Sequence, residues 1–377
     1  MDKIKVMTIL GTRPEIIRLS QVMKKLDEYT KHIIVHTGQN YDYELNEIFF
    51  KDLDIRKPDY FLKVDCSTLG KAYGNILIKS EEVFAREKPD AVLILGDTNS
   101  SISALMAKRL KIPIYHMEAG NRCFDFNVPE EINRRIIDHI SDFNLVYTEH
   151  ARRNLLLEGV HSRKIYLTGS PMKEVLLHNM DKIHNSSIMA ELKLKKEKYF
   201  LISMHREENV DNKNHLKILL ATLELLYKKY KLPIIVSTHP RTRKRIEMFP
   251  GMKKNDKICF LKPFGYFDYV NLQMNSLCVI SDSGSISEEA SILSFPAITV
   301  RNAIERPEAI DTGGIIVTGI NTQTILQSIE LVIKERNKSS TVPHDYEITD
   351  VSHRVVKLIV GTAKLSHLWD GIVKNTA

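Results

Sequence analysis

The segment KVMTILGTRPEIIRLSQVMKKLDEY, residues 5–29, carries the pattern on which the predicted fold rests. Its first six residues form a short, largely apolar run that is typical of a buried β-strand. Gly11 permits a tight turn, and Pro14 suits the start of the helix that follows. From residue 18 to residue 29 the apolar side chains recur at helical spacing. The segment therefore predicts a strand, a glycine turn and a helix, in that order.

The same alternation continues along the chain and then restarts. Further strand-like runs lie at 32–37, 91–95, 112–117, 143–148, 199–204, 232–238, 257–261, 277–281 and 296–300, and segments of helical period such as 100–110 and 215–230 lie between them. Alternation of this kind predicts an α/β fold with parallel sheets and helices on both faces. We expect two α/β domains, at 1–170 and 180–355, joined through the polar stretch 178–197. The tail 356–377 is expected to be helical and to pack back on the first domain.

Composition restricts the class of protein. The chain has 377 residues, 43% hydrophobic and 27% charged, which is ample for two soluble domains. No apolar run reaches the roughly 18–20 residues of a membrane span, and the start lacks the architecture of a signal peptide, so we expect a cytoplasmic protein without a membrane partner. The net charge of +7 is spread along the chain, which suits an anionic small substrate better than nucleic acid. The four cysteines lack CxxC spacing and suggest neither a disulfide framework nor a zinc site.

Polar residues follow several predicted strands of the first half, where open α/β sheets bind their ligands. Arg13 stands at a helix start, where free backbone N–H groups favour an anion. Asp97 and Glu118 each follow a strand, and Glu130 comes soon afterwards, behind a proline. Asp97 also suits the N-cap of the next helix, whereas glutamate caps a helix poorly. The sequence therefore indicates a group of carboxylates at this edge of the first sheet.

Groups suited to a phosphate follow the strands of the second half. These candidates are His205 and His239, the turn Ser283, Gly284 and Ser285, and Glu289 further along the same helix. Small residues at a helix start can bind phosphate through backbone N–H groups and hydroxyls. A capping box formed by Ser285 and Glu288 would also explain this turn, and a single strand-end histidine is more often structural. Together, the two halves predict a cleft for an anionic, hydroxyl-rich ligand such as a nucleotide sugar.

Seven motifs make the sequence similar to a known family. GTRPEIIR, LGDTNSS, HMEAG, PEEINRR, SMHREEN, SDSGSISEEA and ERPEA occur in the order typical of the non-hydrolysing UDP-N-acetylglucosamine 2-epimerases, and the resemblance runs from residue 5 to about residue 360. It implies the GT-B architecture, with two Rossmann-like domains and an active site between them, and a homodimer. It also implies that neither a metal nor a nicotinamide cofactor takes part.

The resemblance also implies a reaction and roles for particular residues. Members of the family invert C2 of the amino sugar by anti elimination of UDP, through a 2-acetamidoglycal, followed by re-addition of UDP. The C2 proton is barely acidic, and its removal and return on two faces require positioned acid–base groups. The catalytic positions of the family fall on Asp97, Glu118, Glu130 and His205. The UDP-binding positions fall on Arg13, Arg18, His239, Ser283, Gly284, Ser285 and Glu289.

Two departures from the family pattern concern the sugar. The loop GNRCFDFNVPEE is shorter than the usual GLRTGDLYSPxPEE, and Glu207 stands where a second arginine is expected. The short loop resembles the branch that converts UDP-2-acetamido-2,6-dideoxy-L-talose to UDP-N-acetyl-L-fucosamine for capsule or O-antigen synthesis. The alternatives are an epimerase acting between UDP-N-acetylglucosamine and UDP-N-acetylmannosamine, a hydrolysing relative that releases UDP, a GT-B glycosyltransferase and a non-catalytic nucleotide-sugar-binding protein.

Overall fold

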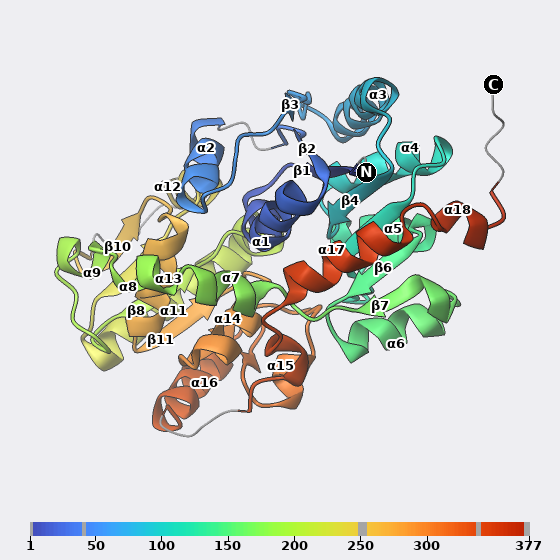
Figure 1. Cartoon of the computed structure of the whole chain (residues 1–377). Coiled ribbons are helices and arrows are strands. Elements are labelled where there is room, and N and C mark those ends of the chain that lie inside the picture. Colours follow the sequence, from blue (N-terminus) through green and yellow to red (C-terminus); the bar gives the residue numbers. More distant parts are fainter. Residues whose placement is uncertain (1–2, 40–42, 248–254, 337–340, 373–377) are drawn as a thin grey trace. The chain divides into compact units, whose positions relative to one another are not determined.

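The computed structural model of the protein describes residues 3–39, 43–247, 255–336 and 341–372, except for the side chains of 43–47, 207, 240, 241 and 247. The chain divides into two compact units, shown in sequence colours in Figure 1. Unit 1 contains residues 1–177 and 344–377, and unit 2 contains residues 178–343. Each unit is built around one parallel sheet.

The sheet of unit 1 has the strand order β3-β2-β1-β4-β5-β6-β7. Its strands are β1 (Lys5–Leu10), β2 (Lys31–His36), β3 (Tyr60–Phe61), β4 (Ala91–Leu95), β5 (Ile114–Ala119), β6 (Phe143–Val146) and β7 (Ile165–Leu167). All the described pairs are parallel. The order reverses between β1 and β4, and ligands of doubly wound folds bind beyond the carboxyl ends of the strands at such a switch point.

Helices enclose this sheet. They are α1 (Arg13–Tyr29), α2 (Tyr43–Asp52), α3 (Leu69–Glu87), α4 (Ser103–Arg109), α5 (Pro129–Ile140), α6 (Glu149–Leu157), α7 (Met172–His178), α17 (Val351–Thr362) and α18 (Ser366–Trp369), with short 3₁₀ turns η1 (Asn99–Ile102), η2 (Ser162–Lys164) and η3 (His344–Tyr346). Met7, Ile9, Val92 and Ile94 form one core with the apolar faces of α3, α4 and α5. Their alternate positions show the period of two that places every second side chain of a strand on one face.

The end of the chain belongs to unit 1. The segment that returns to this unit begins at residue 344, whereas the sequence predicted residue 356. Helix α17 lies beside α1 (Figure 1). The hydroxyl of Thr362, at the end of α17, forms a hydrogen bond of 2.6 Å with the hydroxyl of Tyr115. Residues 344–355, which the sequence placed in the second domain, also lie in unit 1. The reason is a set of hydrogen bonds around Asp345, whose backbone oxygen accepts from the Ser170 N–H at 3.0 Å and whose carboxylate accepts from the Glu149 N–H at 3.1 Å.

The sheet of unit 2 repeats the topology of unit 1, in the order β10-β9-β8-β11-β12-β13. Its strands are β8 (Phe200–Ser203), β9 (Ile234–Ser237), β10 (Ile258–Leu261), β11 (Cys278–Ser281), β12 (Ala297–Thr299) and β13 (Ile316–Val317). Its helices are α8 (Met180–His184), α9 (Ile188–Glu191), α10 (Glu207–Val210), α11 (Lys213–Tyr230), α12 (Pro240–Glu247), α13 (Tyr266–Asn275), α14 (Ile286–Leu293), α15 (Glu308–Asp311) and α16 (Thr322–Lys334). The switch point lies between β8 and β11.

The stretch 178–197 is not simply a linker. It contains α8 and α9, and it packs on α13 of unit 2. The Asn271 side chain donates to the Ile183 backbone oxygen at 2.8 Å, and the Ser186 hydroxyl donates to Asp268 at 2.6 Å. The polar composition of this stretch thus reflects the exposed side of short helices. Among the described residues, no helix has both the length and the apolar character that crossing a membrane requires.

Candidate functional site

The turn after β1 packs tightly against the start of the segment after β4. A Cβ atom on Gly11 would lie 2.1 Å from both the Ser100 and the Thr37 hydroxyl oxygens, so only glycine fits there. Helix α1 begins at Arg13, and the Arg13 guanidinium lies 5.5 Å from the centroid of the Phe49 ring. The predicted anion-binding arginine therefore stands at the switch point of unit 1.

Asp97 and Glu118 lie at the same edge of this sheet. Asp97 follows β4, and its carboxylate is 2.6 Å from the Arg134 guanidinium. The Glu118 carboxylate lies 3.7 Å from the Nε of Arg18. A Cβ atom on Gly96 would be 4.0 Å from Glu118 Oε2, so this carboxylate lies beside the residue that precedes Asp97. The structure thus places two predicted catalytic carboxylates on neighbouring strands at the same edge of the sheet, each with an arginine.

Glu118 has an unusual backbone conformation. The sequence placed it after the strand, but it lies within β5, where the register with β6 shifts between Met117 and Ala119. Its φ angle is 64°, in the left-handed region that residues other than glycine rarely adopt. Such bulges redirect side chains, and backbone strain of this kind is concentrated at functional sites. The bulge is therefore a second indication, independent of the motif, that Glu118 has a function.

The paired glutamates at the start of α5 differ in their surroundings. Glu131 is completely buried, and its carboxylate accepts a hydrogen bond from the Cys123 N–H at 3.1 Å. It also forms ion pairs with Arg134 and Arg135. Glu130 is only half-buried. The pKa of Tyr73 is raised, chiefly because its hydroxyl is buried and to a smaller extent because of the charge of Glu130. Glu131 is thus a structural residue, whereas Glu130 remains available as a candidate acid–base group.

Tyr73 and Asn133 connect the region of Glu130 to Asp97. The Tyr73 hydroxyl donates to Asn133 Oδ1 at 2.6 Å, and Asn133 Nδ2 donates to the Asp97 backbone oxygen at 2.9 Å. These hydrogen bonds hold α3 and α5 to the segment after β4. They therefore connect α5, the helix that carries Glu130, to the backbone of Asp97.

A buried ionic network holds the short loop that follows β5. Asp138 accepts from the Arg122 guanidinium at 2.6 Å and lies 2.9 Å from the His116 ring, and Arg122 also pairs with Glu158 at 2.6 Å. Burial by itself would raise the pKa of Asp138, but the His116 ring and Arg122 lower it below the usual range. The network therefore fixes the start of the loop at residues 120–122.

The rest of the loop carries two exposed aromatic side chains. Phe124 and Phe126 are 69% and 67% exposed, and the Arg135 guanidinium lies 6.0 and 5.2 Å from their ring centroids. Val128 is buried just before α5 and does not contribute to an exposed surface. The apolar surface of this loop therefore consists of two phenylalanine rings beside a cation.

Asp282 organises the switch point of unit 2. Its buried carboxylate accepts from the backbone N–H groups of His205 and Arg206, both at 3.0 Å, and lies 3.2 Å from His205 Nδ1. Burial would raise the pKa of Asp282, but His205, Asn209 and the Arg206 N–H together lower it. The His205 side chain itself is 45% exposed, so a ligand can reach the ring while Asp282 holds it.

The turn after β11 is surrounded by three arginines. A Cβ atom on Gly284 would lie 3.1, 3.7 and 3.8 Å from guanidinium nitrogens of Arg306, Arg206 and Arg301. Ser283 and Ser285 share a hydroxyl contact of 3.1 Å, and α14 begins directly after them. Arg301 is paired with Glu305 at 2.6 Å and Arg306 with Glu288 at 3.0 Å. The guanidinium groups and the helix start still offer several donors suited to an anion such as a diphosphate.

The other two predicted residues of unit 2, Glu289 and His239, differ in their surroundings. Glu289 is 5% exposed, and its carboxylate accepts from Gln273 Nε2 at 2.7 Å. His239 follows β9 and is exposed. Glu207, the second departure from the family pattern, has its side chain outside the described residues.

Several residues of the site were not singled out from the sequence: Arg134 and Asn133 in unit 1, and Asp282, Arg206, Arg301 and Arg306 in unit 2. All except Arg301 lie within the quoted motifs. Arg301 follows the predicted strand 296–300, so the strand-end reasoning used elsewhere would have found it. Their partners in space could not be inferred from the motifs.

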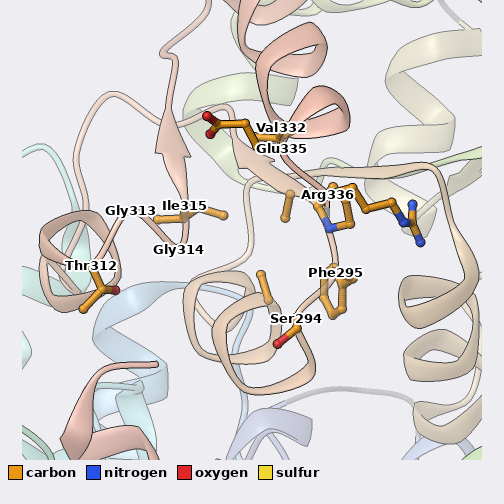
Figure 2. A pocket seen from close by; sticks show the side chains of 12 residues that line it. Ser294, Phe295, Thr312, Gly313, Gly314, Ile315, Val332, Glu335 and Arg336 are labelled. Atoms are coloured by element: carbon orange, nitrogen blue, oxygen red, sulfur yellow. The ribbon is translucent and has the colours of Figure 1, made fainter. Parts of the chain in front are cut away.

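A pocket of about 320 Å³ lies elsewhere in unit 2 (Figure 2). It is lined by the end of α14, by Pro296 and Ala297 at the start of β12, and by Gly313, Gly314 and Ile315 before β13. It therefore opens at the amino ends of the strands, opposite the edge that carries His205 and Ser283. Among the described residues, no group of three or more His, Cys, Asp or Glu side chains is arranged to hold a metal ion.

Comparison with known proteins identifies the family. The family model for UDP-N-acetylglucosamine 2-epimerase matches residues 24–360. The chain belongs to this family. The UDP-N-acetylglucosamine 2-epimerase from Rickettsia bellii, whose structure has been solved, is 50% identical in sequence. The match covers 98% of this chain and 100% of that chain, with a TM-score of 0.92.

Two further epimerases extend the comparison. The enzyme from Methanocaldococcus jannaschii, solved in complex with UDP-GlcNAc and UDP, is 38% identical, with 95% of this chain and 100% of that chain covered and a TM-score of 0.89. The UDP-2,3-diacetamido-2,3-dideoxy-D-glucuronate 2-epimerase from Pseudomonas aeruginosa is 36% identical over 86% of this chain and 91% of its own. The predicted GT-B type of α/β fold, with two parallel sheets, is confirmed.

Glu15 is a buried carboxylic acid at the edge of the candidate site in unit 1. It is 1% exposed, and its carboxyl group accepts from the Gly11 and Thr12 N–H groups at 3.0 and 2.7 Å. The Thr12 and Thr98 hydroxyls donate to it at 2.8 and 3.1 Å. Burial raises the pKa of Glu15 from 4.5 to about 7, although these hydrogen bonds act in the opposite direction.

This raised pKa predicts a pH-dependent contribution to stability. The folded chain holds the Glu15 proton more tightly than the unfolded chain, so the contribution is complete below pH 4.5 and is lost as the pH rises through about 7. The corresponding free energy is about 3 kcal/mol. Glu15→Gln, which resembles the protonated form, should therefore gain stability relative to the wild type as the pH rises from 4.5 to 8. Urea unfolding of both proteins at several pH values measures this, and parallel pH profiles would contradict it.

Proposed function

We propose that the protein inverts C2 of a UDP-2-acetamido sugar by elimination and re-addition of UDP. The observation that carries this proposal is the position of two carboxylates, on Asp97 after β4 and on the strained Glu118 of the neighbouring β5, at the same edge of the sheet of unit 1. Inversion at one carbon requires proton transfer on both of its faces, and one acid–base group serves only one face. A glycosyltransferase has no need for such a pair.

Unit 2 supplies groups suited to the leaving UDP. The helix start at Ser285 and the guanidinium groups of Arg206, Arg301 and Arg306 surround Gly284. Cations and N–H groups placed before the reaction stabilise the charge that develops on the departing diphosphate. We assign His205, His239 and Arg13 to the same substrate, with Arg18 beside Glu118 and Glu289 at the ribose. The family resemblance implies a homodimer, and light scattering of the purified protein would test it. From the sequence we place the protein in the cytoplasm.

The elimination mechanism predicts exchange with solvent. In deuterated water, a C2 proton lost to a carboxylate is replaced by deuterium, so the epimerised product should carry deuterium at C2. NMR of the product measures the isotope and the configuration together, and incubation without protein is the control. An epimerised product that keeps its original hydrogen would rule out the mechanism, and release of UDP with free sugar would indicate a hydrolysing enzyme.

We further infer that the substrate is UDP-2-acetamido-2,6-dideoxy-L-talose, with UDP-N-acetyl-L-fucosamine, a precursor of capsule or O-antigen, as the product. The support is the short loop with its exposed Phe124 and Phe126, which offers apolar surface to a C6 methyl group.

UDP-N-acetylglucosamine is the second candidate substrate. The relatives from Rickettsia bellii and Methanocaldococcus jannaschii are described as epimerases of this sugar, and the latter was solved with it bound. These relatives are 50% and 38% identical in sequence to this chain, and this similarity supports UDP-N-acetylglucosamine as a substrate. Separate assays with the two purified UDP-sugars distinguish the candidates.

A further inference from the structure

We propose that Glu15 is a positioning residue for the reaction, because its buried carboxyl group joins the turn that carries Arg13 to Thr98, the residue after Asp97. This inference rests on the proposed function, since it concerns how Asp97 is held for proton transfer. Neither the family motifs nor the reaction assigns a role to this glutamate.

The ordinary role of Glu15 is that of a helix cap. It occupies the third position of α1, and with Thr12 it forms a capping box. A capping box requires only that the glutamate bond the N–H of the cap residue. Glu15 additionally accepts from the Gly11 N–H at 3.0 Å and from the Thr98 hydroxyl at 3.1 Å. Burying a carboxyl group is unfavourable, and capping alone does not require it.

The bond to Thr98 connects Glu15 to a segment that is distant in the sequence. Thr98 is 83 residues away in the sequence, and its hydroxyl does not cap the 3₁₀ turn that follows. The bond therefore crosses from the turn after β1 to the turn after β4, the two sides of the switch point. Since Thr98 is covalently attached to Asp97, this bond restricts where the Asp97 carboxylate can lie.

Helix α1 also contacts a second predicted catalytic carboxylate, that of Glu118. Arg18 lies three residues after Glu15, a spacing that places two side chains on the same side of a helix. Its Nε is 3.7 Å from Glu118. The first turns of α1 thus contact two of the segments that carry predicted acid–base groups: Glu15 contacts that of Asp97 through Thr98, and Arg18 contacts Glu118 directly.

Unit 2 contains a comparable arrangement at its own switch point. There the buried Asp282, at the end of β11, accepts from the His205 and Arg206 N–H groups after β8. In each unit, a buried carboxyl group thus connects the turns that follow the two strands on either side of the switch point. The repetition favours a role in positioning over a role in capping one helix.

The test removes the bond and leaves the rest of the site intact. Thr98→Val keeps the shape of threonine but lacks the hydroxyl, and Thr98→Ser keeps the hydroxyl. A lost hydrogen bond of about 1.4 kcal/mol corresponds to about a tenfold change in rate. We expect Thr98→Val to lower kcat and the rate of C2 deuterium exchange about tenfold. The dissociation constant for UDP should change less than about twofold, because Thr98 does not belong to the groups assigned to UDP, and Thr98→Ser should restore kcat.

A matched control and a double variant separate positioning from stability. Thr30 is buried at the other end of α1, where its hydroxyl donates to the Leu26 backbone oxygen at 2.6 Å, and Thr30→Val should leave kcat unchanged. In an Asp97→Asn background, Thr98→Val should have little further effect, because both changes act through the same carboxylate. If Thr98→Val unfolds, Thr98→Ala provides the same comparison with less bulk.

The outcomes are distinguishable. Deuterium at C2 of the wild-type product supports the proposed function whatever the variants do. Given that result, a Thr98→Val protein with wild-type kcat, a Thr98→Ser protein as slow as the valine variant, or full additivity with Asp97→Asn would each overturn the role of Glu15.

Discussion

Replacing Asp97, Glu118 or Glu130 by the corresponding amide is expected to lower kcat by about 10²- to 10⁴-fold, the usual scale for a lost general acid–base group. The amides keep nearly the same shape but cannot accept the C2 proton. UDP binding should change little, because the groups assigned to the diphosphate are the turn at Gly284 and its arginines, together with Arg13. Steady-state kinetics and calorimetric titration with UDP measure the two effects separately.

The surroundings of the three carboxylates allow a sharper comparison. Asp97 is 2.6 Å from Arg134, and Glu118 is 3.7 Å from Arg18, so both amide variants also remove an ion pair. Their unfolding free energies should be measured alongside kcat, so that a loss of folding is not taken for a loss of chemistry. Glu149→Gln is a matched control, since Glu149 is an exposed carboxylate in the first turn of α6 in the same unit. An amide variant with the kcat of this control would lose its assigned role.

The second large effect concerns the choice of sugar. We expect a kcat/KM for UDP-2-acetamido-2,6-dideoxy-L-talose about 5- to 150-fold higher than for UDP-N-acetylglucosamine. An apolar surface accepts a methyl group at C6, whereas an unpaired hydroxyl buried against it costs about 1–3 kcal/mol. The exposed rings of Phe124 and Phe126 provide that surface, and part of the preference also comes from the L-configuration.

Loop variants test whether these rings cause the preference. Phe126→Ser and Phe124→Ser remove one ring each, and grafting the longer, polar loop typical of the family removes both. Each change should reduce the preference without lowering kcat for UDP-N-acetylglucosamine. Val128→Ala is a useful contrast, because Val128 is buried before α5 and its truncation should affect stability and not specificity. Turnover of UDP-N-acetylglucosamine alone by the unmodified protein would show that the second candidate substrate is the right one.

Much of the fold could be predicted from local patterns. The bounds of β1 and β4 agree with the expected runs 5–10 and 91–95, because strands buried on both faces read as continuous apolar segments. The strands β3, β7 and β13 were missed. They have only two or three residues and lie at the edges of their sheets, where burial is incomplete and the apolar signal is weak.

The sequence by itself determined the kinds of residue at the site and their positions at strand ends, because glycine turns, helix starts and strand periodicity are local properties. It could not determine their partners. The bond from Thr98 to Glu15 spans 83 residues, and the contact of Asp282 with the His205 N–H spans 77. Only the order of the strands, which places β1 beside β4 and β8 beside β11, brings these residues together. The bulge at Glu118 likewise arises from pairing between β5 and β6, so it too was decided by the tertiary structure.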